Sequence, residues 1–153
     1  GNWAPGPLRP AARPERGIDV KLPQMSVAAD KEIIIPVSVE RAADKGIISY
    51  EFDLRYDPSV MQPLAEPVDV AGTVSRGLTI VTNANEPGLL RVVVYGPLPI
   101  EENGTLLNLR FTAVRAGGSV SPMTFERIMF NEGETLVTVN EGIITTLHRE
   151  SYH

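Results

Sequence analysis

Cysteine is absent from the 153-residue chain, and histidine is nearly so, since His148 and His153 are the only two. Without cysteine the chain has no disulfide bonds, thiolate metal sites or cysteine nucleophiles. Both histidines fall within the last six residues, where a chain end does not hold a general base within hydrogen-bond reach of a reacting group. We therefore expect no metal centre and no histidine-dependent catalysis.

Positive charge and long apolar runs are also scarce. The chain has 14 Lys and Arg against 19 Asp and Glu, a net charge of −5 and a pI near 5.0. Binding to nucleic-acid phosphates requires clustered Lys and Arg, so we expect no nucleic-acid partner. No apolar run approaches the roughly 18–20 residues that cross a bilayer. Phosphate-binding loops, nucleophile elbows and zinc-protease helices are missing as well, which predicts no cofactor.

Pairs of acids are the remaining candidates for catalysis, because glycosidases use two carboxylates. Glu51 and Asp53 lie on one side of an expected strand, about 7 Å apart from the rise per residue. Polar residues fill the solvated side of a strand in any case. Glu101 and Glu102 are adjacent on an expected loop, where their side chains diverge. We predict that the chain is not an enzyme.

Proline is concentrated at the N-terminus, where residues 1–16 contain four of the thirteen prolines and the only tryptophan. Such a segment cannot form a regular hydrogen-bond ladder and should be extended or polyproline II. It is either a linker or a partner-binding segment, and its apolar groups favour the second. The residues that would contact a partner are Trp3, Pro5, Pro7, Leu8 and Pro10. We divide the chain into an extended tail (1–17), a β domain (18–147) and a short C-terminal tail (148–153).

Alternation of apolar and polar residues dominates the β domain. In residues 48–56 the apolar positions, which should face a core, are Ile48, Tyr50, Phe52, Leu54 and Tyr56. The intervening positions, which should face water, are Ser49, Glu51, Asp53 and Arg55. Asp57 and Pro58 then form a turn. This pattern is typical of a strand with one buried face.

Other short runs follow at intervals typical of an all-β domain. Strands are expected at 18–22, 33–39, 78–82, 89–95, 107–113, 123–130, 135–139 and 142–147. Pro36 lacks an N–H, which predicts an edge or a bulge at that point. Residues 60–77 look loop-like, with short extended pieces, and residues 89–95 are apolar on both faces and should lie centrally. No helical period is sustained. The pattern predicts a two-sheet sandwich.

Four stretches, in order, resemble the cohesin domain family. Residues 46–61 (GIISYEFDLRYDPSVM) resemble its long strand ending in a YDP turn, and residues 85–92 its turn into a central strand. Residues 100–111 and 139–144 resemble two later segments. The resemblance covers about residues 18–147. It implies a nine-stranded jelly-roll sandwich of two antiparallel sheets, secretion, and non-covalent protein binding without catalysis.

The resemblance also implies a binding face. In cellulosomal members, outward polar residues of the YDP strand grip a dockerin, and the matching positions here are Ser49, Glu51 and Asp53. Many of those members have Asn and Asp where this chain has Ser49 and Glu51. Cohesin-like modules also occur in cell-surface and secretion-related proteins of bacteria that lack cellulosomes.

Three functions remain open at this point. The leading hypothesis is a secreted or cell-surface structural module that binds further copies of itself through the N-terminal tail and forms a filament. The alternatives are an adaptor for a dockerin-like domain and a carbohydrate-binding module, although only Tyr95 is expected to be an exposed strand aromatic. Asn103 begins an N-G-T sequon, which indicates either glycosylation or simply a hairpin turn.

Overall fold

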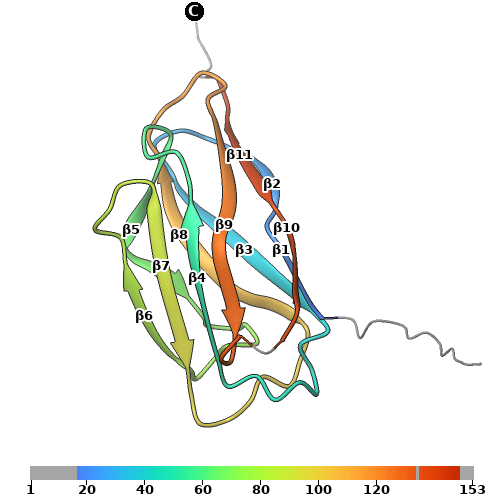
Figure 1. Cartoon of the computed structure of the whole chain (residues 1–153). Helices are drawn as coiled ribbons and strands as arrows, with labels where there is room; N and C mark the ends of the chain where they lie inside the picture. Colours follow the sequence, from blue (N-terminus) through green and yellow to red (C-terminus); the bar gives the residue numbers. More distant parts are fainter. Residues whose placement is uncertain (1–16, 134, 149–153) are drawn as a thin grey trace, which may run out of the picture.

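Two β-sheets pack face to face in the computed structural model, which describes residues 17–133 and 135–148 (Figure 1). The five-stranded sheet has the order β10-β1-β3-β8-β5. These strands span Val137–Asn140, Ile18–Lys21, Glu32–Glu40, Gly104–Ala113 and Met61–Asp69. The six-stranded sheet has the order β2-β11-β9-β4-β7-β6. Its strands span Gln24–Val27, Gly142–Thr146, Val120–Phe130, Ser49–Arg55, Leu89–Tyr95 and Thr79–Asn83.

The core lies between the sheets and follows the alternation in the sequence. Along β4 the side chains of Tyr50, Phe52 and Leu54 are buried, because successive residues of a strand point to opposite faces. Each such side chain contributes about 1.5–3 kcal/mol by leaving water. Tyr56, just after β4, meets Phe111 of β8 edge to face, with ring centroids 5.1 Å apart. This pair joins the two sheets.

The predicted fold class is confirmed, but the described residues form eleven strands rather than nine. Two of the changes from one sheet to the other take place within only one or two residues, between β1 and β2 near Pro23 and between β10 and β11 at Glu141. If β1 and β2 are counted as one strand, and β10 and β11 as another, the total is nine. The expected strands 135–139 and 142–147 therefore lie in different sheets. They pair in parallel with β1 and β2, so neither sheet is wholly antiparallel.

Hydrogen bonds continue across the two crossings. The Leu22 N–H donates to the Asn140 carbonyl (2.9 Å), and the Ile143 N–H donates to the Pro23 carbonyl (3.1 Å). The backbones approach so closely here that a Cβ on Gly142 would lie 2.5 Å from the Pro23 oxygen. Glycine at this position allows the two segments to change sheets side by side.

Two expectations about individual segments are wrong. Residues 60–77 include β5, a nine-residue strand, because its prolines hide the alternation in the sequence. Its pairing with β8 shifts register between Pro63 and Val68, and prolines are tolerated there because β5 is an edge strand. Ile48 is 48% exposed rather than buried, because the strand begins one residue later.

The expectation for Pro36 is confirmed. At this residue β3 pairs with β8 only, because β1 reaches no further than Ser38. A register shift follows directly, between Val37 and Ser38. On the side of β3 away from β8, no strand is therefore present to pair with this proline.

Candidate functional site

The outer face of strands β9, β4, β7 and β6 carries the residues that the YDP strand was predicted to present. Ser49, Glu51 and Asp53 alternate with the buried core side chains of β4 and are half-buried on this face. Glu51 lies opposite Val93 of β7 and Met129 of β9. Asp53 lies opposite Arg91 and Arg127 on the same two strands. The neighbours of the predicted residues are thus fixed by register.

Both acids form ion pairs within the sheet. Arg127 Nη1 donates to Glu51 Oε2 at 2.8 Å, and Arg91 Nε lies 3.5 Å from Asp53 Oδ1. The arginine is the more exposed member of each pair. The side chain of Arg91 is 59% exposed against 14% for Asp53, and that of Arg127 is 45% exposed against 35% for Glu51. The acid is therefore the less accessible member of each pair.

A third ion-pair group lies at one end of this face and depends on an irregularity in β9. The β4–β9 register shifts between Asp53 and Leu54, which leaves Glu126 as an extra residue between paired positions. Glu126 Oε2 accepts a hydrogen bond from Arg55 Nε at 2.8 Å, and Glu86 binds the same guanidinium at 3.0 Å. The hydrogen bond from Arg55 lowers the pKa of Glu126, and the two carboxylates raise the pKa of Arg55.

An apolar cluster, formed by Val81, Val93 and Tyr95, lies beside the charged pairs. Val81 of β6 is directly opposite Val93 of β7, and Tyr95 is two residues further along β7. All three side chains are exposed. The prediction that residues 89–95 lie centrally is correct for the sheet order, because β7 has strands on both sides. Its second apolar face, however, is covered by nothing among the described residues. Exposed apolar clusters rimmed by charge are typical of interaction sites.

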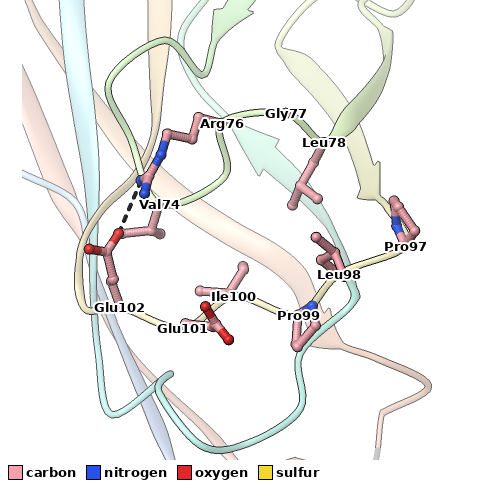
Figure 2. A pocket seen from close by; sticks show the side chains of 10 residues that line it. All are labelled: Val74, Arg76, Gly77, Leu78, Pro97, Leu98, Pro99, Ile100, Glu101 and Glu102. Carbon is pink, nitrogen blue, oxygen red and sulfur yellow. Dashed lines mark hydrogen bonds and ion pairs between the residues drawn. The ribbon is translucent and has the colours of Figure 1, made fainter.

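A shallow hollow of about 330 Å³ opens where β7 ends, between the loop before β6 and the loop after β7 (Figure 2). Its apolar lining is Val74, Leu78, Pro97, Leu98, Pro99 and Ile100. Arg76 Nη1 and Glu102 Oε1 close one side with an ion pair at 3.0 Å. Leu98 is exposed at its edge. The loop on one side of the hollow, residues 97–102, begins two residues after Tyr95.

Asn103, the predicted glycosylation site, is exposed in the loop before β8. Its side-chain oxygen accepts a hydrogen bond from the Ala42 N–H at 3.0 Å. The nitrogen that a glycan would occupy takes no part in this bond. Glycosylation at Asn103 stays a prediction, and the residue has a structural role in addition.

Several predicted residues fall outside the described part of the chain. These are the tail residues Trp3, Pro5, Pro7, Leu8 and Pro10, together with His153. Within the described ranges, no group of three or more His, Cys, Asp or Glu residues is placed to hold a metal ion. Nor do these ranges contain a helix long and apolar enough to span a membrane.

The sequence did not identify Val81, Arg91, Val93 and Arg127 as members of this face. They come from strands whose register against β4 cannot be read from one chain. The sequence did, however, contain a pattern that indicates part of the apolar cluster. Residues 89–95 are apolar at alternate positions on both sides, which indicates a strand whose second face is either buried or available for binding.

The fold and this face define an all-β sandwich with an exposed, ion-paired sheet surface. The family model for the cohesin domain matches residues 18–146. The chain therefore belongs to the cohesin family. A comparison with curated proteins gave no match.

Solved structures with this fold are similar to the chain at low sequence identity. The sixth cohesin of scaffoldin B from Acetivibrio cellulolyticus, in complex with a dockerin, is 19% identical with a TM-score of 0.71, covering 86% of this chain and 99% of that chain. The cohesin in a type I cohesin–dockerin complex from Clostridium thermocellum is 19% identical with a TM-score of 0.69 and the same coverage. A non-cellulosomal cohesin from the archaeon Archaeoglobus fulgidus is 18% identical with a TM-score of 0.72, covering 88% and 94%.

Proposed function

We propose that the chain is a non-catalytic, extracellular protein-interaction module whose outer face on β9, β4, β7 and β6 binds a dockerin-like partner. The observation that carries the proposal is the exposed cluster of Val81, Val93 and Tyr95 beside the ion-paired arginines. An apolar centre with a charged rim is the arrangement in which protein interfaces concentrate their binding free energy. The cohesins of Acetivibrio cellulolyticus and Clostridium thermocellum with this fold were solved with dockerins bound, which supports a partner of that kind.

The β4 residues have a particular role in this proposal. Ser49, Glu51 and Asp53 lie on the strand between the apolar cluster and β9. Glu51 and Asp53 hold the arginines in place, and Ser49 lies opposite Tyr95 with its hydroxyl available to a partner. The face is thus a surface of fixed side chains, which lowers the entropy lost on binding.

Self-assembly through the N-terminal tail is a second candidate. It is favoured by the sequence of residues 1–16, in which Trp3 and Leu8 lie among prolines. A polyproline segment loses little conformational entropy when it binds. In this candidate the tail of one copy docks on the sheet of the next, and repeated head-to-tail contacts build a filament. A carbohydrate-binding function has less support, because Tyr95 is the only exposed aromatic residue in the described ranges.

The experiment measures how tightly three versions of the chain bind dockerin domains and extracellular proteins from the source organism. The first is the natural chain, the second carries Val93→Asp and Tyr95→Asp, and the third carries Ile34→Asp. Ile34 is equally apolar and exposed but lies on β3 in the other sheet. We expect the face variant to lose about tenfold or more in affinity, since central hot-spot residues contribute about 2 kcal/mol or more.

Circular dichroism confirms that both variants are folded before binding is compared. A partner held equally well by the natural chain and the face variant would refute the proposed face. Sedimentation of the natural chain and of a version lacking residues 1–16 tests the second candidate. Polymers that persist without residues 1–16 would exclude the tail as the assembly element.

A further inference from the structure

We propose that β6 is a self-association site, at which two copies of the chain pair edge to edge as antiparallel strands about a two-fold axis through Val81. This pairing joins two six-stranded sheets into one continuous sheet. Backbone hydrogen bonds between the two edges hold the copies together, so the pairing does not depend on the partner proposed for the outer face. It is supported by the composition of the edge, by its symmetry and by the charges at its ends.

An edge strand leaves backbone N–H and C=O groups unpaired, and proteins commonly protect such edges with proline, charge, bulges or short length. In the part of the chain that the structure describes, β10, β5, β2 and β6 form the sheet edges. β5 contains two prolines, two acids and a register shift. β2 and β10 are limited to four residues each by the crossings between the sheets. β6 is the longest of these edge strands without proline or charge.

The composition of β6 suits the addition of a strand. Four of its five residues, 79–82, are the β-branched Thr, Ile, Val and Thr. The longer segment 77–85 contains neither a charged residue nor a proline. Segments of this kind pair readily with further strands. A net charge of −5 makes copies repel one another, and an uncharged edge keeps that repulsion out of the contact.

The two faces of the sheet restrict the register of a symmetric pair. Val81 is exposed on the outer face, whereas Ile80 and Thr82 alternate with it and are half-buried. A two-fold axis between two residues would oppose an outward side chain to an inward one, so the axis passes through a residue. Centred on Val81, the pair uses all five residues, with Val81 opposite Val81 and Thr79 opposite Asn83. Centring on a neighbour leaves part of the strand unpaired.

Charges at the two ends of β6 favour the antiparallel arrangement. Arg76 lies three residues before the strand, and Glu86 lies three residues after it. In an antiparallel pair, Arg76 of each copy therefore lies at the same end as Glu86 of the other. Each is already in an ion pair, with Glu102 and Arg55 respectively, but their side chains are still 62% and 61% exposed. A parallel pair would bring like charges together.

The edge is also accessible. β6 lies at the left boundary of the molecule in Figure 1, and β1 and β10, where the described chain begins, lie on the opposite side. On the inner side, a hollow of about 600 Å³ lies between β5 and the end of β6, with Leu64 and Thr82 in its lining. This hollow leaves room for the side chains that an added strand directs inward.

The pairing has a consequence for the outer face. The two-fold axis is perpendicular to the joined sheet, so the outer faces of both copies point in the same direction. Two binding faces held in this way engage a partner with two binding domains more tightly than either face alone, because the second contact becomes intramolecular.

Cysteine substitution tests the register, because the natural chain has no cysteine. Directly opposed residues of antiparallel strands have Cβ atoms about 4.5–5.5 Å apart, close to the span of a disulfide. Val81→Cys should therefore form a covalent dimer with oxidised glutathione, seen in non-reducing electrophoresis. Thr79→Cys, also exposed, is the matched control. Its cysteines lie about 13 Å apart along the strands, so it should link to an Asn83→Cys copy but not to itself.

Sedimentation equilibrium measures the strength of the pairing. The natural chain should show a monomer–dimer equilibrium that is retained when residues 1–16 are removed. Val81→Lys places two like charges opposite one another and should raise the dissociation constant by about tenfold or more. Ile34→Lys is the matched control, because Ile34 and Val81 are both 53% exposed and Ile34 lies in the other sheet. It should leave the dimer unchanged.

Charge exchange tests the ends of the strand. Arg76→Glu and Glu86→Arg should each weaken the dimer, because each places like charges at both ends. In a mixture of the two variants the opposite charges meet again, and native mass spectrometry should show more heterodimer than either homodimer. A mixture of Arg110→Glu with Glu86→Arg has the same net charges without this match, and should show no such preference.

A natural chain that stays monomeric up to about 1 mM would overturn the self-association site. Equal cross-linking of Val81→Cys and Thr79→Cys, or dimers that persist in Val81→Lys, would do the same. So would a cysteine at position 81 that links to other extended peptides and never to a second copy. Failure of the proposed function is a separate result, since Val93→Asp with Tyr95→Asp alters the outer face and should leave cross-linking through position 81 intact.

Discussion

The phenolic hydroxyl of Tyr50 lies 2.7 Å from the hydroxyl of Ser75, inside the sandwich. Tyr50 belongs to β4 and Ser75 to the loop before β6, and both residues are almost completely buried. Burial raises the pKa of Tyr50, so the phenol stays neutral. The Ser75 N–H in turn donates to Thr73 Oγ1 at 3.2 Å. This buried pair fixes the loop that forms one side of the hollow at the end of β7.

Tyr50→Phe should lower the free energy of unfolding by about 1–2 kcal/mol, because it leaves the buried Ser75 hydroxyl without its partner. Urea unfolding followed by circular dichroism measures the change. Tyr95→Phe removes an exposed hydroxyl and should change stability by less than about 0.5 kcal/mol. Adding Ser75→Ala to Tyr50→Phe should recover part of the loss. Equal effects of the two tyrosine substitutions would contradict the assigned role.

Asn103→Ala should destabilise the domain by about 1–2 kcal/mol, since the N–H of the fully buried Ala42 loses its acceptor. Asn103→Asp retains an acceptor oxygen at the same place and should lose much less. Both substitutions remove the sequon. Intact mass after expression in a glycosylating host therefore reports on the glycan, and unfolding reports on the hydrogen bond. If the two variants are equally unstable, the bond to Ala42 is not the cause.

Asp57 links stability to pH through its turn. Asp57 Oδ1 accepts hydrogen bonds from the Ser59 hydroxyl (2.7 Å) and the Ser59 N–H (2.9 Å), and these lower the pKa of Asp57 below its usual 3.8. A lowered pKa in the folded state means a stabilising contribution that is present above pH 3.8 and lost as pH falls below it. Asp57→Asn does not titrate there. The natural chain and the variant should therefore differ less in free energy of unfolding at pH 2 than at pH 5, as measured by urea unfolding. A difference that stays constant with pH would contradict this role of Asp57.

Gly142→Ala should destabilise the domain by about 1–3 kcal/mol through overpacking. The added Cβ would lie 2.5 Å from the Pro23 carbonyl oxygen and 2.8 Å from Leu22 Cβ, and the backbone atom cannot move aside freely. Glu141→Ala, one residue earlier and exposed, should stay within about 0.5 kcal/mol. Thermal unfolding of the two variants measures the difference. Similar melting temperatures would show that the crossing tolerates a side chain.

The sequence predicted those parts of the fold that depend on alternation alone. The buried residues of β4 follow from a strict period of two, and the sandwich class follows from many such runs. The turn after β4 follows from Asp57 and Pro58. The segment at Met61–Asp69 escaped prediction because its prolines resemble loop composition, and an edge strand permits them. The change of sheet at Pro23 escaped prediction because its cause, a close approach of Gly142, involves residues far apart in the chain.

The outer face of β9, β4, β7 and β6 was predicted in part for the same reason. Ser49, Glu51 and Asp53 were placed on the outward side of one strand from the sequence. Their partners come from β7 and β9, and register between distant strands depends on the folded packing. Glu126 reaches Arg55 only because β9 has an extra residue at this point, which leaves no mark in the composition. The ion pairs on this face could therefore be identified only from the structure.

The parallel pairing of the first and last strands has a mechanical consequence. Ile18 and Val137 begin their strands side by side at one end of the sandwich, and the chain leaves β11 at the opposite end (Figure 1). Tension between residues 17 and 148 would pull these two segments past each other along their length. All the hydrogen bonds that join β1 to β10 and β2 to β11 then share the load together instead of opening one after another. A domain connected in this way should resist unfolding when it is pulled between these two ends.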